Sequence, residues 1–108
     1  MSMPIQNTDH LEWLDTWYRK QCNGEWEHSQ GVHLSPHEES GWQLIINLTG
    51  TSAENTPPQK LAFDSPAGDW ITCTLEGGRF EGSGDPRRLE QIIGVFRRWI
   101  DSAAAARS

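Results

Sequence analysis

The feature that most limits how this chain can fold is a stripe of large apolar side chains near its C-terminal end. The stripe recurs at spacings of 3, 4, 7, 10 and 11 residues from its first member and consists of Leu89, Ile92, Ile93, Phe96, Trp99 and Ile100. These spacings place the side chains on one face of an α-helix. Asp85 can cap this helix, and Pro86 suits its first position. Such a helix needs a second apolar layer, which the rest of the chain must provide.

Short segments with the alternation typical of β-strands can form that layer. In residues 41–49, Trp42, Leu44, Ile46 and Leu48 alternate with mainly polar neighbours. The other four segments are residues 31–35, a stretch around Leu61 and Phe63, residues 70–76 and residues 79–82. Gly77-Gly78 is a two-residue hairpin turn, because glycine accepts the positive φ that such turns require. Short turns between successive strands predict an antiparallel sheet.

A first helix is predicted over about residues 9–21. Asp9, with Glu12 three residues later, fits a capping-box pattern, and Asn23-Gly24 ends the helix. Its apolar face consists of Leu11, Trp13, Leu14, Trp17 and Tyr18. The order helix, five strands, helix predicts an α+β fold. We expect a five-stranded, mainly antiparallel meander sheet with the N-terminal and C-terminal helices packed on one face.

The length of the chain predicts one domain. Its 108 residues fall within the usual size of a single domain. We expect an ordered core over about residues 9–101, followed by an alanine-rich tail from Ser102 that frays. Hydrophobic residues make up 35% of the chain, but six residues are tryptophans. Each buried aromatic ring removes about 150–250 Å² from water, so the chain can still build a core.

The net charge of −6 is distributed unevenly. Residues 1–54 contain eight acids and two bases, whereas residues 55–108 contain seven of each. An acidic surface repels phosphate backbones and anionic lipids, which argues against a nucleic-acid or membrane partner, and it attracts basic proteins. Simple solubility explains the same charge equally well.

The cysteine content indicates no disulfide framework, because Cys22 and Cys73 are the two cysteines of the chain. The sequence shows no secretory signal pattern. It also contains no apolar stretch that approaches the roughly 20 residues needed to cross a bilayer. We therefore expect a cytoplasmic protein with free thiols.

The candidate catalytic and metal-ligating residues do not form a recognisable site. His28, His33 and His37 are spaced so that a strand would separate them rather than direct them at one ion. Cys22 follows a helix C-terminus, whose dipole disfavours a thiolate, and Cys73 is predicted to face the core. We therefore expect no catalytic residue, no metal and no cofactor. A small enzyme that uses a Cys/His pair remains an alternative.

The tryptophans leave two roles open. Trp13, Trp42 and Trp99 lie at periodic apolar positions and are assigned to the core. Trp26 lies between two glutamates and outside any periodic stripe, so it is either a loop anchor or a recognition residue. Exposed tryptophans also stack on sugars, which keeps a carbohydrate-binding module as a further alternative.

Several motifs spread over most of the chain carry a family resemblance. Residues 13–28 read W-L-D-T-W-Y-R-K-Q-C-N-G-E-W-E-H, and they are followed by Gly41-Trp42, N-L-T-G-T at 47–51, Asp69-Trp70, Phe80-Glu81-Gly82 and a helix that ends at Trp99. From about residue 11 to 101 the chain closely resembles the immunity protein 53 family of bacterial polymorphic toxin systems. It departs from the family pattern at residues 35–40, where His37-Glu38-Glu39-Ser40 replaces an Asp-Asn-Pro-like turn. If that loop contacts the partner, the specificity of this chain differs.

The resemblance implies an antidote that binds a cognate protein toxin in the producing cell and blocks its activity. Many toxins of this kind are nucleases with basic clefts, and an acidic protein is steered towards such a cleft. The implied partner-binding residues are Glu12, Asp15, Glu25, Trp26, Glu27, His28, Glu38 and Glu39. On this hypothesis the carboxylates pair with basic groups of the toxin, and Trp26 is the aromatic anchor.

Overall fold

A computed structural model describes residues 10–38 and 41–107 of the chain. Its elements are, in chain order, α1 (His10–Gln21), α2 (Trp26–Ser29), β1 (Val32–Pro36), β2 (Trp42–Asn47), β3 (Gln59–Asp64), β4 (Trp70–Glu76), β5 (Arg79–Gly84) and α3 (Leu89–Arg107). Asp9, the predicted cap of the first helix, lies outside the described residues. The short helix α2 was not predicted, whereas every other element corresponds to a predicted one.

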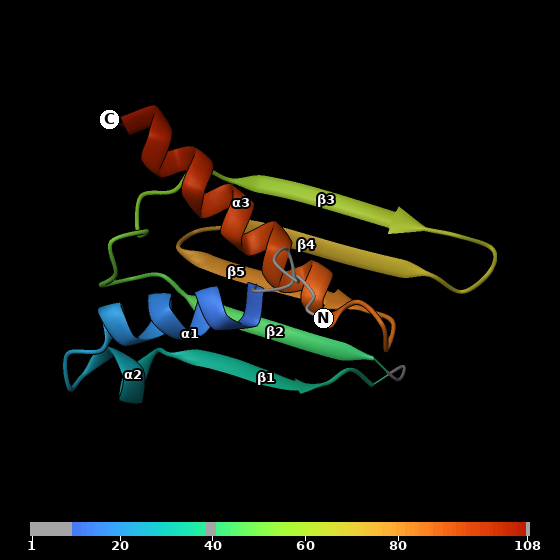
Figure 1. Cartoon of the computed structure of the whole chain (residues 1–108), viewed down its shortest axis with the longest axis horizontal. Coiled ribbons are helices and arrows are strands. Elements are labelled where there is room, and N and C mark those ends of the chain that lie inside the picture. Colours follow the sequence, from blue (N-terminus) through green and yellow to red (C-terminus); the bar gives the residue numbers. More distant parts are fainter. Residues whose placement is uncertain (1–9, 39–40, 108) are drawn as a thin grey trace, which may run out of the picture.

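The strands form one five-stranded antiparallel sheet, with α1 and α3 on the same face (Figure 1). This confirms the predicted α+β class and the placement of both helices. The strand order is β1-β2-β5-β4-β3, so β5 and not β3 lies beside β2. The sheet therefore departs from a simple meander at one connection, which leads from β2 to the far edge.

Two features of the chain fit this order. The connection between β2 and β3 packs into the core on its way across the end of the sheet, with Leu48, Thr51, Ala53 and Thr56 buried. Strand β5 fits the centre of the sheet because glycine lets α3 approach it closely. A Cβ added at Gly82 would lie 2.6 Å from Cγ2 of Ile92 on α3.

The core lies between the sheet and the two helices. Phe80 of β5 and Phe96 of α3 are fully buried with their ring centroids 4.9 Å apart, and Trp13 of α1 meets Phe96 edge-on. Helix α3 continues to Arg107, beyond the predicted start of fraying at Ser102, and Ala103 within this last stretch is buried. Alanine has the highest helix propensity of all residues, which favours this extension.

Asp85 connects the sheet to α3, although it does not cap that helix directly. Helix α3 begins at Leu89, and Asp85 instead accepts hydrogen bonds from the backbone N–H of Trp70 at 2.8 Å and of Arg87 at 3.0 Å. It also pairs with Nε of Arg88 at 2.9 Å. The N–H of Trp70, followed by that of Arg87 and the Arg88 guanidinium, lowers the pKa of Asp85 to about 2. Asp85 therefore caps the turn that precedes α3 and not the helix itself, and Pro86 lies in that turn.

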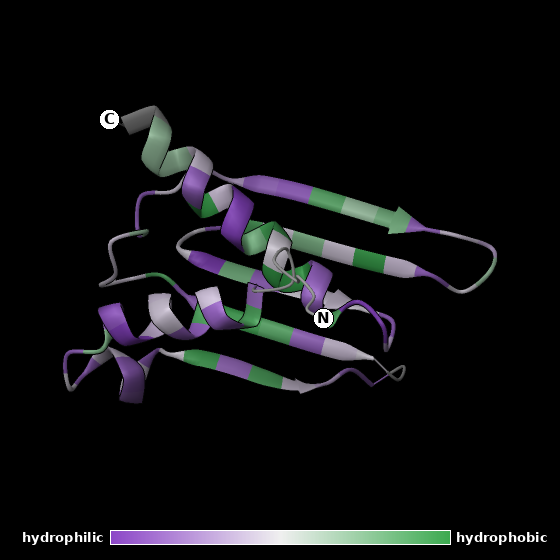
Figure 2. Ribbon diagram, viewed as in Figure 1, coloured by the Kyte–Doolittle hydropathy of each residue, from purple (hydrophilic) through white to green (hydrophobic). Residues whose placement is uncertain are grey.

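The two faces of the sheet differ in polarity. Apolar bands alternate with polar ones along the strands (Figure 2), and the buried members, such as Leu44, Ile46 and Leu75, belong to the core beneath the helices. Across the described residues, no helix is long and apolar enough to span a membrane.

Candidate functional site

The predicted partner-binding residues that the structure describes lie on or beside α1, α2 and β1, which form one flank of the molecule (Figure 1). Trp26, at the start of α2, is the structural centre of this flank. Its side chain is 3% exposed, and its Nε1 donates a hydrogen bond to the backbone oxygen of Asn47 at 2.9 Å. Its ring packs edge-on against Trp17 and at a tilt against Tyr18.

These contacts correct one of the site predictions. A side chain buried against α1 and β2 is not exposed to offer an anchor to a partner, so Trp26 is the loop anchor of the two roles considered for it. The loop needs such an anchor because α2 has four residues and cannot hold itself in place.

Local hydrogen bonds hold the loop that precedes Trp26. Oδ1 of Asn23 accepts the backbone N–H groups of Glu25 and Trp26 at 2.9 and 3.0 Å. The carboxylate of Glu27 turns back and accepts the N–H groups of Asn23 and Gly24, both at 2.9 Å. Backbone N–H groups, including these two, lower the pKa of Glu27. Glu27 therefore has a structural role in the loop, whether or not it also contacts a partner.

The other predicted acids are exposed and surround β1. Glu12 and Asp15 lie on α1, Glu25 lies just before α2, and Glu38 follows the far end of β1. With Glu27 they form what we call the acidic rim (Glu12, Asp15, Glu25, Glu27 and Glu38). Glu39 lies outside the described residues. The rim is extended rather than focused, because the five residues of β1 separate its two ends by about 16 Å.

The rim differs from the acids of the C-terminal half in its ion pairs. In that half Asp69, Glu81, Asp85 and Asp101 each pair with an arginine. In the rim Asp15 pairs with Arg19, and no described base forms an ion pair with the other members. His28, the remaining predicted residue, is exposed on α2 beside Glu27. Among the described residues, Glu12, Glu25 and Glu38 of the rim are thus exposed acids without an ion pair.

An apolar groove runs between α1 and β1, inside the rim. It has a volume of about 280 Å³ and is lined by Leu11, Leu14, Tyr18, Val32 and Asp15. Leu11 is 57% exposed, and Leu34, two residues beyond Val32 on the same face of β1, is 48% exposed. The sequence pattern had assigned Leu11 to the core-facing side of its helix. β1 is the edge strand of the sheet, however, and Leu11 faces the open groove that α1 forms with Val32 of that strand.

The edge of β1 also carries backbone groups that point away from the sheet. In the β1–β2 pair, the N–H of Asn47 bonds to the oxygen of Gly31 and the N–H of His37 bonds to the oxygen of Gly41. Hydrogen-bonded positions alternate along an antiparallel pair. The register therefore directs the N–H and C=O of Val32 and Leu34 outward. The sequence had left open which strands form the edges.

The histidines and cysteines do not assemble into a reactive site. Nε2 of His33 lies 2.7 Å from the oxygen of Gln30, and the ring of His37 lies against Trp70. Sγ of Cys22 donates to the oxygen of Tyr18, while burial raises the pKa of Cys73 to about 12, which makes that thiol inert. Within residues 10–38 and 41–107, no three His, Cys, Asp or Glu side chains gather so that they could hold a metal ion.

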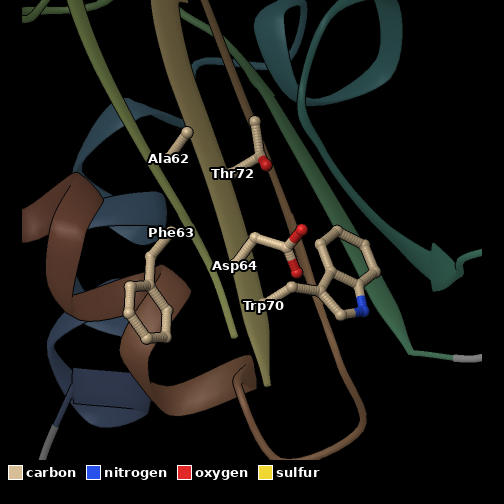
Figure 3. A pocket seen from close by; sticks show the side chains of 5 residues that line it. All are labelled: Ala62, Phe63, Asp64, Trp70 and Thr72. Carbon is tan, nitrogen blue, oxygen red and sulfur yellow. The ribbon is translucent and has the colours of Figure 1, made fainter. Parts of the chain in front are cut away.

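A second hollow lies at the opposite edge of the sheet. It has a volume of about 410 Å³ and is lined by Ala62, Phe63, Asp64, Trp70 and Thr72 of β3 and β4. Asp64 and Trp70 project to one side, and Phe63 points away from them (Figure 3). The indole of Trp70 is half-buried, and the ring of His37 packs against it at a centroid distance of 5.1 Å.

Comparison with known proteins gives one match. The family described as immunity protein 53 matches residues 11–101, which include the whole sheet, nearly all of α1 and most of α3. No curated protein and no solved structure matches the chain.

Proposed function

This chain belongs to the immunity protein 53 family, and we propose that it is an antidote that binds and neutralises a cognate bacterial toxin. On this proposal it is a binding protein and not an enzyme, and it acts in the cytoplasm of the cell that makes the toxin. The partner presents a basic surface, such as the active-site cleft of a nuclease.

The acidic rim is the observation that carries the proposal beyond the family. Carboxylates that are already paired contribute to the fold, whereas those without an intramolecular partner are available to a basic protein. A surface of one sign raises the rate of association with a surface of the opposite sign and suppresses wrong partners. An antidote needs both properties, because it must bind the toxin quickly and bind it specifically.

The proposal can be tested with the protein encoded beside this chain's gene. We expect that protein to be toxic when it is expressed alone and harmless when it is co-expressed with this chain. The two purified proteins should form a tight complex of fixed stoichiometry, as measured by calorimetry. A neighbour that is harmless alone, or a toxic one that this chain neither binds nor neutralises, would contradict the antidote function.

A further inference from the structure

We infer that the toxin is held through the edge of β1, where an extended segment of the toxin adds a sixth strand to the sheet. The segment carries basic residues and places apolar side chains in the groove beneath α1. This inference rests on the proposed antidote function and specifies the surface that carries it out.

The first support is the backbone of β1. A strand that joins a sheet needs outward-facing N–H and C=O groups on the existing edge, and these groups supply much of its affinity. The register directs those of Val32 and Leu34 outward. Pro36, which has no N–H, ends the strand, so the pairable stretch is short and defined.

The second support is the apolar surface beside that edge. In strand addition, alternate side chains of the new strand enter pockets on one face, and these pockets provide specificity. The groove between α1 and β1 lies on the helix-covered side, next to the outward-facing backbone. The exposed side chains of Leu11 and Leu34 flank it. A new strand would cover both leucines, which the isolated chain leaves in water.

The acidic rim selects between the possible occupants. A second copy of this chain could also pair along β1, but it would bring a second set of unpaired carboxylates to the same edge. Like charges brought together at an interface oppose association. A basic strand would instead meet Glu25 near one end of β1 and Glu38 beyond the other. The charges therefore favour a basic protein segment over a second copy.

The most direct test is residue-resolved hydrogen exchange of this chain, alone and bound to a catalytically inactive form of the neighbouring toxin. Strand addition should slow the exchange of the Val32 and Leu34 amides by at least about a hundredfold, because it converts exposed amides into hydrogen-bonded ones. The outward-facing amides of Lys60 and Ala62, on the opposite edge, serve as the internal control and should not change. A tight complex in which Val32 and Leu34 exchange as in the free chain would overturn the inference.

A matched pair of substitutions provides a second test. Leu34→Pro removes an outward N–H without breaking a bond to β2, and the proline ring occupies the space of an incoming carbonyl. Ala62→Pro makes the same change on the edge of β3. We expect Leu34→Pro to weaken toxin binding about a hundredfold and Leu34→Ala about tenfold, since alanine loses only the side-chain contact. Ala62→Pro should leave the affinity unchanged. Circular dichroism and thermal unfolding would establish that each variant is folded.

The outcomes separate this inference from the proposed function. If the wild-type chain neutralises the toxin and Leu34→Pro binds equally well, the strand-addition surface is wrong and the antidote function stands. If the wild-type chain does not bind the toxin, both the antidote function and the strand-addition surface are contradicted. If sedimentation shows a wild-type dimer that Leu34→Pro abolishes while toxin affinity is retained, the edge belongs to a second copy and the inference is overturned.

Discussion

The two edges of the sheet have opposite chemistry. On β3 the residues with outward-facing backbone groups include Lys60 and Asp64, and two prolines, Pro57 and Pro58, precede the strand. Charges and prolines of this kind discourage pairing with another chain. On β1 the corresponding residues are Val32, Leu34 and the terminal Pro36. Val32 and Leu34 are aliphatic and lie beside an apolar groove. The fold is protected against strand addition at one edge and open to it at the other.

The contrast extends to the acids near each edge. Asp69, Asp85 and Arg88 form a connected cluster that fastens β4 and β5 to α3, so their charges are used within the fold. Around β1 the carboxylates of Glu12, Glu25 and Glu38 are exposed and unpaired among the described residues. Asp64, Glu76 and Glu90 are likewise exposed and without an ion pair among the described residues. The two sides therefore differ in the Asp85–Arg88 cluster and in the aliphatic edge of β1, and not in the number of unpaired acids.

The largest effect that we expect is a loss of stability when the buried side chain of Trp26 is removed. Replacing Trp26 with alanine should lower the free energy of unfolding by about 3–5 kcal/mol, because it empties a buried site between Trp17 and Tyr18. Trp26→Phe keeps a ring but loses the bond to Asn47, and it should cost about 1 kcal/mol beyond the change in size. Urea denaturation followed by circular dichroism measures both values. If Trp26→Ala left the stability unchanged but abolished toxin binding, Trp26 would be a contact residue of the interface and not a structural anchor.

Trp26 also shows where prediction from the sequence ends. Helix α3 and the strands were predictable, because their apolar periods are local properties of the chain. A four-residue helix is too short to show a period, so α2 and the burial of its tryptophan were missed. The available local signal was Asn23 itself, because asparagine commonly accepts backbone N–H groups at the start of a helix or turn, as it does here from Glu25 and Trp26.

The strand order and the site depend on contacts between distant residues. The close approach of α3 to β5 depends on the fit of Gly82 beneath Ile92, which no local pattern reveals. Leu11 has the spacing of a core residue, and its exposure follows from the fact that β1 is the last strand on that side. The acids of the rim could be named from composition. Their arrangement around an open edge required the sheet order.

The next largest effect is expected from reversing charges in the rim. Glu25→Lys combined with Glu38→Lys should weaken toxin binding by about a hundredfold at low salt, mainly through slower association. The matched control, Glu76→Lys with Glu90→Lys, makes the same change in net charge at exposed positions away from β1. Surface plasmon resonance at several salt concentrations compares the two, and the difference should shrink as salt rises. An equal loss in both variants would mean that net charge matters and the rim does not.

A smaller effect, visible only in acid, is expected from Asp85 in its cluster with Arg88. The pKa of Asp85 is lowered to about 2 in the folded chain, against about 3.9 when unfolded. A lowered pKa contributes stability above the unfolded value, and this contribution is lost as the pH falls from about 4 through 2. Thermal unfolding should therefore show a midpoint that falls over this window. Asp85→Asn should be less stable at neutral pH and should show a flatter decline.

The smallest effect is expected from removing the protection of the β3 edge. Lys60→Val with Asp64→Val gives β3 the aliphatic character of β1 without the acidic rim or the groove beneath α1. Backbone pairing of one isolated strand is marginal in water, so we expect self-association only at about millimolar concentration and unchanged affinity for the toxin. Sedimentation and calorimetry measure the two quantities. If this variant bound a second toxin molecule tightly, an unprotected edge alone would be sufficient for toxin binding. The groove and the acidic rim would then not explain why the toxin binds at β1.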